Sequence, residues 1–176
     1  RVDRRQRQMC IRDSFNLISS VKGFENWLSN LDVVYVGGGN TKFMLKYWKE
    51  NNLIGLFKEV YNSGIILSGV SAGAACWFDC FLTDSDGPGF KSMNGIGLLT
   101  GSFTPHYSDS KRAEKYRENI KNKTLPDGIA VDDGVAVLFI DGKPTEVYSS
   151  RKGHNAYFVN QNKQFNLKEY IKINNE

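Results

Sequence analysis

Residues 69–73 (Gly-Val-Ser-Ala-Gly) fit the G-x-S-x-G pattern, in which the serine acts as a nucleophile. In that pattern a strand turns sharply into a helix at the serine, which strains the backbone and requires small neighbours. Both halves of this context are present, because an apolar run at 64–68 precedes the motif and a helix-like stretch follows it to about Phe81. The pattern therefore predicts Ser71 as a nucleophile. The alternative is a serine that only caps the following helix.

A serine nucleophile needs a base, and the sequence contains two histidines, His106 and His154. His106 follows Pro105 after a predicted strand end, which is a rigid place to hold an imidazole. His154 lies in a segment rich in solvating residues, 149–155. The sequence favours His106 as the base and keeps His154 as the alternative. A surface histidine without a catalytic role is the competing explanation for either.

The base in turn needs an acid that holds its tautomer. Asp132 and Asp133 follow a short apolar run at 129–131, whereas Asp84 and Asp86 lie in the loop after the serine motif. An acidic pair at a strand end is well placed for function, but such pairs are common at turns. The residue types alone leave all four acids open.

An oxyanion hole needs backbone N–H groups aimed at the developing negative charge. The Ala72 amide follows the predicted nucleophile, and the glycine turn at 37–39 can supply a second N–H group. Glycine turns also bind phosphate, but the sequence contains neither G-x-x-x-x-G-K-[ST] nor G-x-G-x-x-G. The turn is therefore assigned to the oxyanion.

The three cysteines, Cys10, Cys76 and Cys80, do not form a recognisable metal-binding pattern. A zinc site needs more cysteine or histidine ligands than this spacing provides. We expect buried thiols in a reducing cytosol, with no metal and no organic cofactor.

Short apolar runs alternate with helical spacing along the chain, which predicts an α/β fold with a mostly parallel sheet flanked by helices on both faces. Residues 41–62 are predicted to form two helices broken near Asn51 and Asn52, and residues 109–122 a charged helix. Three runs end at the glycine turn, the serine motif and the Asp132-Asp133 pair. Active groups collect at the carboxyl ends of such strands. The sequence Asp141-Gly142 between two apolar runs predicts a C-terminal hairpin.

Length and charge restrict the function classes. The 176 residues suffice for one domain, and no apolar run reaches the 18 residues of a membrane span, so we expect no membrane partner. The net charge is +4, but residues 1–14 alone carry five arginines and two aspartates. The rest of the chain is nearly neutral, which argues against nucleic-acid binding. Residues 1–14 lack the features of a secretory signal and are expected to be non-native or disordered.

Four motifs, at 36–40, 69–74, 104–107 and 131–134, together resemble the dipeptidase E and cyanophycinase family of serine peptidases. The resemblance covers about residues 30–160. It implies a cytoplasmic serine peptidase with a Ser-His-acid triad, on a fold related to the class I glutamine amidotransferases. Its partner would be a small peptide substrate, and the protein would be a monomer or a homodimer.

The resemblance also implies roles for individual residues. Ser71 would be the nucleophile and His106 the base, and the acid, often glutamate in the family, would be Asp133. An aspartate in the loop after the serine has been considered a charge-relay member in relatives, which keeps Asp84 as an alternative. The oxyanion amides would be those of Gly38 and Ala72.

Selectivity for an N-terminal aspartate would require an arginine downstream of the histidine, for which the chain offers Arg112 and Arg117. Family members usually begin with a further strand–helix–strand unit. The expectation is therefore a single domain over residues 15–176 that lacks this unit. A non-catalytic binding domain of the same fold remains an alternative function. A third possible function is an esterase, whose catalytic residues would follow one another along the sequence in the order serine, acid, histidine.

Overall fold

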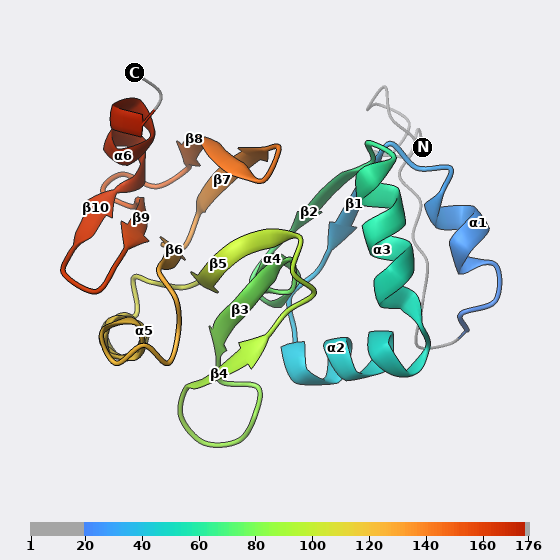
Figure 1. Ribbon diagram of the computed structural model, residues 1–176, viewed down its shortest axis with the longest axis horizontal. Coiled ribbons are helices and arrows are strands. Elements are labelled where there is room, and N and C mark those ends of the chain that lie inside the picture. Colours follow the sequence, from blue (N-terminus) through green and yellow to red (C-terminus); the bar gives the residue numbers. More distant parts are fainter. Residues whose placement is uncertain (1–19, 175–176) are drawn as a thin grey trace, which may run out of the picture.

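The computed structural model describes residues 20–174 (Figure 1). The helices of this part are α1 (Phe24–Leu28), α2 (Thr41–Glu50), α3 (Leu53–Asn62), α4 (Ala72–Ala75), α5 (Ser110–Lys121) and α6 (Leu167–Asn174). Its strands are β1 (Val33–Val36), β2 (Ile66–Gly69), β3 (Phe78–Thr83), β4 (Lys91–Asn94), β5 (Leu99–Thr104), β6 (Gly128–Val131), β7 (Val135–Ile140), β8 (Lys143–Ser149), β9 (Ala156–Val159) and β10 (Gln164–Asn166). The expectations for residues 1–14 lie outside the described residues.

The strands form a six-stranded sheet of order β10-β9-β6-β5-β3-β4 and two separate pairs, β1-β2 and β7-β8. Strands β3, β5 and β6 are parallel to one another, and so are β1 and β2. Strands β4, β9 and β10 pair with their neighbours in antiparallel fashion. The fold is therefore α/β as predicted, but its central sheet is mixed rather than mostly parallel. Short connections such as those between β3 and β4 and between β9 and β10 can join only antiparallel neighbours.

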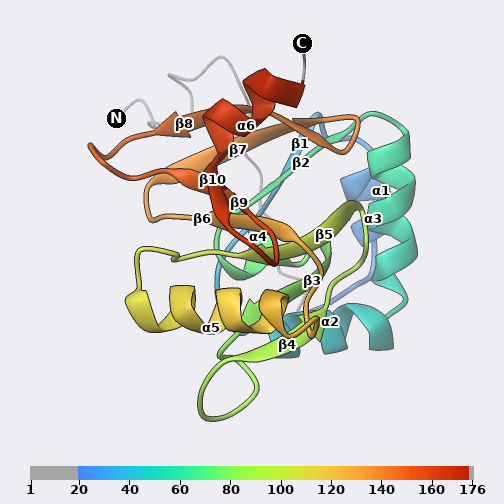
Figure 2. The same cartoon turned by 60° about the vertical axis from the view of Figure 1, so that its left-hand side comes forward.

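The two faces of the six-stranded sheet are covered by different elements, as Figure 2 shows. Helix α5 packs against Leu82, Ala130 and Val159 on one face. Helix α6 and the β7-β8 pair cover Phe81 and Ile129 on the other. Adjacent residues of a strand point to opposite faces, so both faces of this sheet are apolar.

Helices α1, α2 and α3 pack on one face of the β1-β2 pair around a cluster of aromatic side chains. The ring centroids of Trp48 and Phe57 lie 4.4 Å apart, and Trp48 stacks on Trp77 at 5.9 Å. Two helices with a break near Asn51 and Asn52 are confirmed, and Asn52 itself adopts a φ of 55° between them. The packing of α1, α2 and α3 thus supports β1 and the glycine turn that follows it.

The prediction that the helix after the serine motif reaches about Phe81 is wrong. Helix α4 ends at Ala75, and residues 78–83 form β3. The side chains of Phe78 and Phe81 are buried in the core, where Phe78 stacks on Phe103 of β5 at 4.6 Å. Aromatic residues pack well on a pleated sheet surface, and here that packing outweighs the helical spacing. None of the described helices has the length and apolar character to cross a membrane.

Candidate active site

Ser71 stands at the turn from β2 into α4, in a strained backbone conformation with φ 54° and ψ −113°. Positive φ is uncommon for residues other than glycine and costs on the order of 1–3 kcal/mol. Ser71 is the N-cap residue of α4, but its side chain makes no capping hydrogen bond. Its Oγ lies instead 2.8 Å from Nε2 of His106. The hydroxyl is therefore directed at the imidazole of His106 and not at the helix.

The two glycines of the motif allow three backbones to approach closely. A Cβ added at Gly69 would lie 2.0 Å from the carbonyl oxygen of Gly73, and one added at Gly73 would lie 2.1 Å from the carbonyl oxygen of Val36. Both distances are well below van der Waals contact, and both involve backbone atoms. Strands β1 and β2 and helix α4 can therefore pack in this way only when both positions lack a side chain.

His106 follows β5 and also has a positive φ, of 55°. The next residue, Tyr107, donates its N–H to the carbonyl oxygen of Val131 at 3.0 Å, which fastens the turn to the end of β6. This places Nδ1 of His106 2.5 Å from Oδ1 of Asp133, the second residue after β6. The imidazole thus lies between the serine hydroxyl and a carboxylate.

Asp133 is partly exposed, and its hydrogen bond to His106 holds the pKa of the carboxyl below its usual range. The charge of His106, a hydrogen bond from Ser108 at 3.2 Å and the charge of Arg151 also lower this pKa, whereas desolvation, the second-largest effect, raises it. An ionised carboxylate is the form that stabilises a protonated imidazole.

The other three candidate acids have different partners. Asp132 accepts the N–H of Asn155 at 2.9 Å and so fastens the start of β9. Asp84 forms an ion pair with Arg112 at 3.0 Å. Asp86 pairs with Lys42 and Lys91. Of the four acids considered, the structure brings Asp133 to His106.

The glycine turn lies directly against the serine. A Cβ added at Gly38 would lie 3.3 Å from the Cβ of Ser71 and 3.9 Å from its Oγ. Ala72 is the first residue of α4, so its N–H is among those without an acceptor inside the helix. The backbones of Gly38 and Ala72 therefore flank the Ser71 side chain.

The two arginines singled out in the sequence differ in their surroundings. Arg112 is buried, donates to the carbonyl oxygen of Leu82 at 3.3 Å and lies over the ring of Phe90 in addition to its pairing with Asp84. Arg117 is exposed and donates to the hydroxyl of Tyr107 at 3.0 Å. Arg112 is thus neutralised within the fold, whereas Arg117 reaches the residue next to His106.

His154 lies in the loop between β8 and β9, and the structure does not bring it to Ser71 as it brings His106. Its Nδ1 is buried without a hydrogen-bond partner among the residues that the structure describes. Burial raises the pKa of the Cys76 and Cys80 thiols, so neither resembles an activated thiolate. Residues 20–174 contain no group of three or more side chains suited to hold a metal ion.

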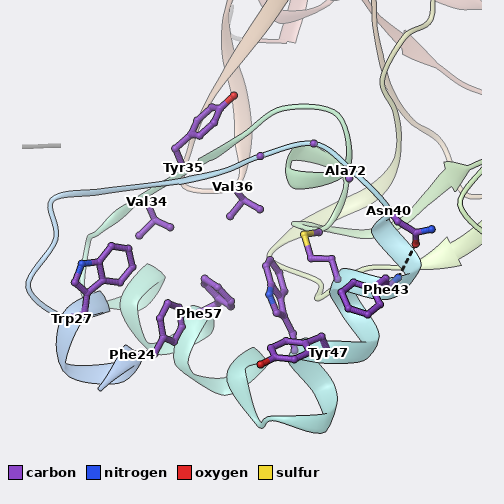
Figure 3. Close-up of a pocket in the computed structure, with 15 residues that line it drawn as sticks. Phe24, Trp27, Val34, Tyr35, Val36, Asn40, Phe43, Tyr47, Phe57 and Ala72 are labelled. Atoms are coloured by element: carbon purple, nitrogen blue, oxygen red, sulfur yellow. Dashed lines mark hydrogen bonds between the residues drawn. The ribbon is translucent and has the colours of Figure 1, made fainter. Parts of the chain in front are cut away.

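A cavity of about 360 Å³ lies beside the glycine turn, between β1 and the helices that cover it (Figure 3). Val34 and Val36 point into it from β1, and aromatic side chains of α1, α2 and α3 surround it. Its wall includes Gly38 and Ala72. The sequence does not predict this cavity. Its only signal was the aromatic spacing of Phe43, Tyr47 and Trp48, which is equally typical of a filled core.

The chain is similar in sequence to known peptidases. The model of "Peptidase family S51" matches residues 14–147. A Bacillus subtilis (strain 168) protein, "Uncharacterized peptidase YgaJ", is 44% identical over 135 residues, which cover 76% of this chain and 58% of that protein. Peptidase E of Haemophilus influenzae is 28% identical over 154 residues, covering 83% of this chain and 70% of its own.

Among solved structures, the crystal structure of a peptidase from an acI-B1 Actinobacterium has a TM-score of 0.56 at 15% sequence identity. The match covers 83% of this chain and 61% of that one, and it supports the fold alone. The chain spans 58% of the length of the Bacillus relative and 61% of the length of this solved structure.

Proposed function

Since the chain belongs to peptidase family S51, with peptidase E among its relatives, we propose that it hydrolyses short peptides by serine-type acyl transfer. The observation that carries the proposal is the continuous row of side chains Ser71, His106 and Asp133. These three residues come from the ends of β2, β5 and β6, which are far apart in the sequence. A surface serine or histidine without a role does not explain this convergence.

In the proposed reaction, Nε2 of His106 takes the proton of the Ser71 hydroxyl while Oγ attacks the peptide carbonyl carbon. Asp133 accepts a hydrogen bond from the Nδ1–H group of His106 and stabilises the imidazolium that forms. His106 then gives its proton to the leaving amine as the peptide C–N bond breaks. A water molecule, deprotonated by His106, attacks the acyl-enzyme and releases the carboxylic acid and the free serine.

The negative charge of the tetrahedral intermediate needs donors that are already in place. The amides of Gly38 and Ala72 are proposed for this role, since both backbones flank Ser71. The strained φ of Ser71 is typical of a nucleophile elbow, which raises the hydroxyl from the end of the sheet. The absence of a side chain at Gly38 would leave room for the oxyanion.

Selectivity for an N-terminal aspartate stays a prediction within this proposal. It needs a cation near the reacting carbonyl, and Arg117 is the candidate because Arg112 is buried and paired. If Arg117 binds the aspartate, Arg117→Ala raises KM for Asp-Xaa dipeptides and leaves other dipeptides unaffected. An equal effect on all dipeptides contradicts this role.

The function is tested by dipeptide hydrolysis with purified variants. Ser71→Ala and His106→Ala are expected to lower kcat by at least about a thousandfold, because the triad acts as a unit. His154→Ala is the matched control and keeps turnover. A Ser71→Ala variant that hydrolyses peptides at the wild-type rate contradicts the mechanism. A folded wild-type chain that binds dipeptides without turnover points to a binding domain instead.

A further inference from the structure

We infer that the cavity between β1 and α1–α3 receives an apolar or aromatic side chain of the peptide substrate. This inference rests on the proposed function, because it gives that reaction its substrate class. The cavity lies next to the reacting groups, since Gly38 and Ala72 belong both to its wall and to the surroundings of Ser71. A peptide held at Ser71 therefore has a neighbouring side chain within reach of the cavity.

The uncharged, largely aromatic lining of the cavity favours an apolar ligand. The floor is built from Val34, Trp48 and Phe57, of which Trp48 is 4% exposed and Phe57 2%. None of the described residues that line the cavity carries a charge. An aspartate side chain placed there would lose its water without gaining a cationic partner among the described lining residues, which is unfavourable. An apolar side chain would bury its surface against aromatic rings, as ligands do in pockets of this kind.

Phe43 is the lining residue best suited to set this preference. It is 53% exposed, and its ring stacks against Tyr47 with centroids 6.2 Å apart. Its N–H donates to the side chain of Asn40 at 2.8 Å, the bond that caps α2 directly after the glycine turn (Figure 3). The turn that supplies the Gly38 amide thus also positions Phe43, so the proposed oxyanion group and the cavity are held by the same element.

The test compares kcat/KM for matched dipeptides that carry phenylalanine or asparagine at one position and the same neighbour at the other. Both positions are varied in turn. Wild type is expected to prefer phenylalanine at one of the positions by at least about tenfold, and Phe43→Ala is expected to remove most of this preference. Tyr148→Ala, at another exposed aromatic on β8, is the control and keeps the preference. Equal rates for both dipeptides at both positions overturn the inference.

A binding measurement separates this inference from the catalytic proposal. The Ser71→Ala variant is titrated with N-acetylphenylalanine amide and with N-acetylasparagine amide, and the fluorescence of Trp27 and Trp48 in the cavity reports binding. Saturable binding of the phenylalanine amide that Phe43→Ala weakens at least about tenfold supports the cavity even if the wild type hydrolyses no peptide. Hydrolysis without such binding supports the mechanism and contradicts the cavity's role.

Discussion

Two of the residues at the candidate site, Ser71 and His106, hold a backbone conformation that non-glycine residues usually avoid. Neighbouring residues hold each conformation in place. For Ser71 this is the close backbone packing at Gly69 and Gly73, and for His106 it is the hydrogen bond from the N–H of Tyr107 to the carbonyl oxygen of Val131. Strain of this kind persists only where the surrounding structure determines it. The proposed reaction gives a reason for it, because both side chains must point away from their own elements to meet.

The lowered pKa of Asp133 predicts how stability depends on pH. A carboxylate whose pKa is lowered by folding stabilises the native state above its unfolded value of about 3.9, and this contribution is lost as the pH falls through the lowered value. We expect Asp133→Asn to lower the midpoint of urea unfolding at pH 6, with a difference from wild type that shrinks toward pH 2.

Asp141→Asn serves as the control for this measurement. Asp141 is exposed in the turn between β7 and β8, where its φ of 50° suits asparagine equally well. Its urea midpoint should follow wild type at every pH. A deficit of Asp133→Asn that stays constant or grows in acid contradicts the role given to the bond with His106.

Among single residues, the sequence predicted the position of Ser71 and favoured His106, because both stand in short motifs with their own structural context. It did not decide the acid. Four aspartates near strand ends are equivalent by type, and their partners come from distant segments. The choice depends on which carboxylate the pairing of β5 and β6 brings to the imidazole, and that is a tertiary property.

Among the elements, two glycine substitutions are expected to have opposite effects, one in the close packing of β1, β2 and α4 and one on the surface of α3. Gly69→Ala forces backbone atoms apart and should lower the free energy of unfolding by at least about 2 kcal/mol. Gly55→Ala, in an exposed turn of α3 with no atom near the new Cβ, should raise it by about 0.5–1 kcal/mol. Chemical denaturation of both variants checks the pair, and a tolerated Gly69→Ala contradicts the close approach.

The loop between β3 and β4 joins two segments of the site. The hydroxyl of Ser85 accepts the N–H of Thr41 at 3.1 Å, directly after the glycine turn, while Asp84 holds Arg112 in α5. We expect Ser85→Ala to lower kcat several-fold with a smaller change in KM, because the turn that carries Gly38 becomes less fixed.

Ser85→Thr keeps the hydroxyl and should restore kcat. Ser92→Ala, at an exposed position of β4, is the control and should leave both constants unchanged. Steady-state kinetics on the same dipeptide compare the three variants. A Ser85→Ala variant with wild-type kcat shows that the loop does not position the turn.

Helices α2 and α3 could be predicted from the apolar spacing of residues 41–62, and α5 as a charged helix over residues 109–122. Strand β3 could not, since Phe78, Phe81 and Leu82 follow α4 after only two residues and their spacing also fits a helix. The order of the strands in the sheet could not be predicted from the sequence either. Strands of three to seven residues carry little information about their partners, and pairing is decided by which apolar faces can be covered together.

At the scale of the whole molecule, one face of the β1-β2 pair is apolar and uncovered by the described residues. Val33, Tyr35 and Ile66 are 51%, 63% and 60% exposed, and Val33 pairs with Ile66 across the two strands. Exposed contiguous apolar patches favour association. The double variant Val33→Thr/Ile66→Thr should therefore remain monomeric at higher protein concentration than wild type.

Sedimentation at several concentrations measures this effect. Ile173→Thr, which removes another exposed apolar side chain on α6, is the control and should associate like wild type. Equal association of the double variant and wild type shows that this face is not the contact. Dipeptide hydrolysis should proceed at the same rate in all three proteins, because Val33, Ile66 and Ile173 are not residues of the candidate site.

Activation of Ser71 as a nucleophile by His106 can be measured by labelling with a fluorophosphonate probe. The probe phosphonylates activated serines with loss of fluoride, and peptide mass spectrometry identifies the modified residue. Circular dichroism checks that the protein is folded. Activation of Ser71 by His106 predicts one adduct, at Ser71, that His106→Ala abolishes and His154→Ala leaves intact. A folded wild-type chain without an adduct at Ser71, or an adduct undiminished in His106→Ala, contradicts it.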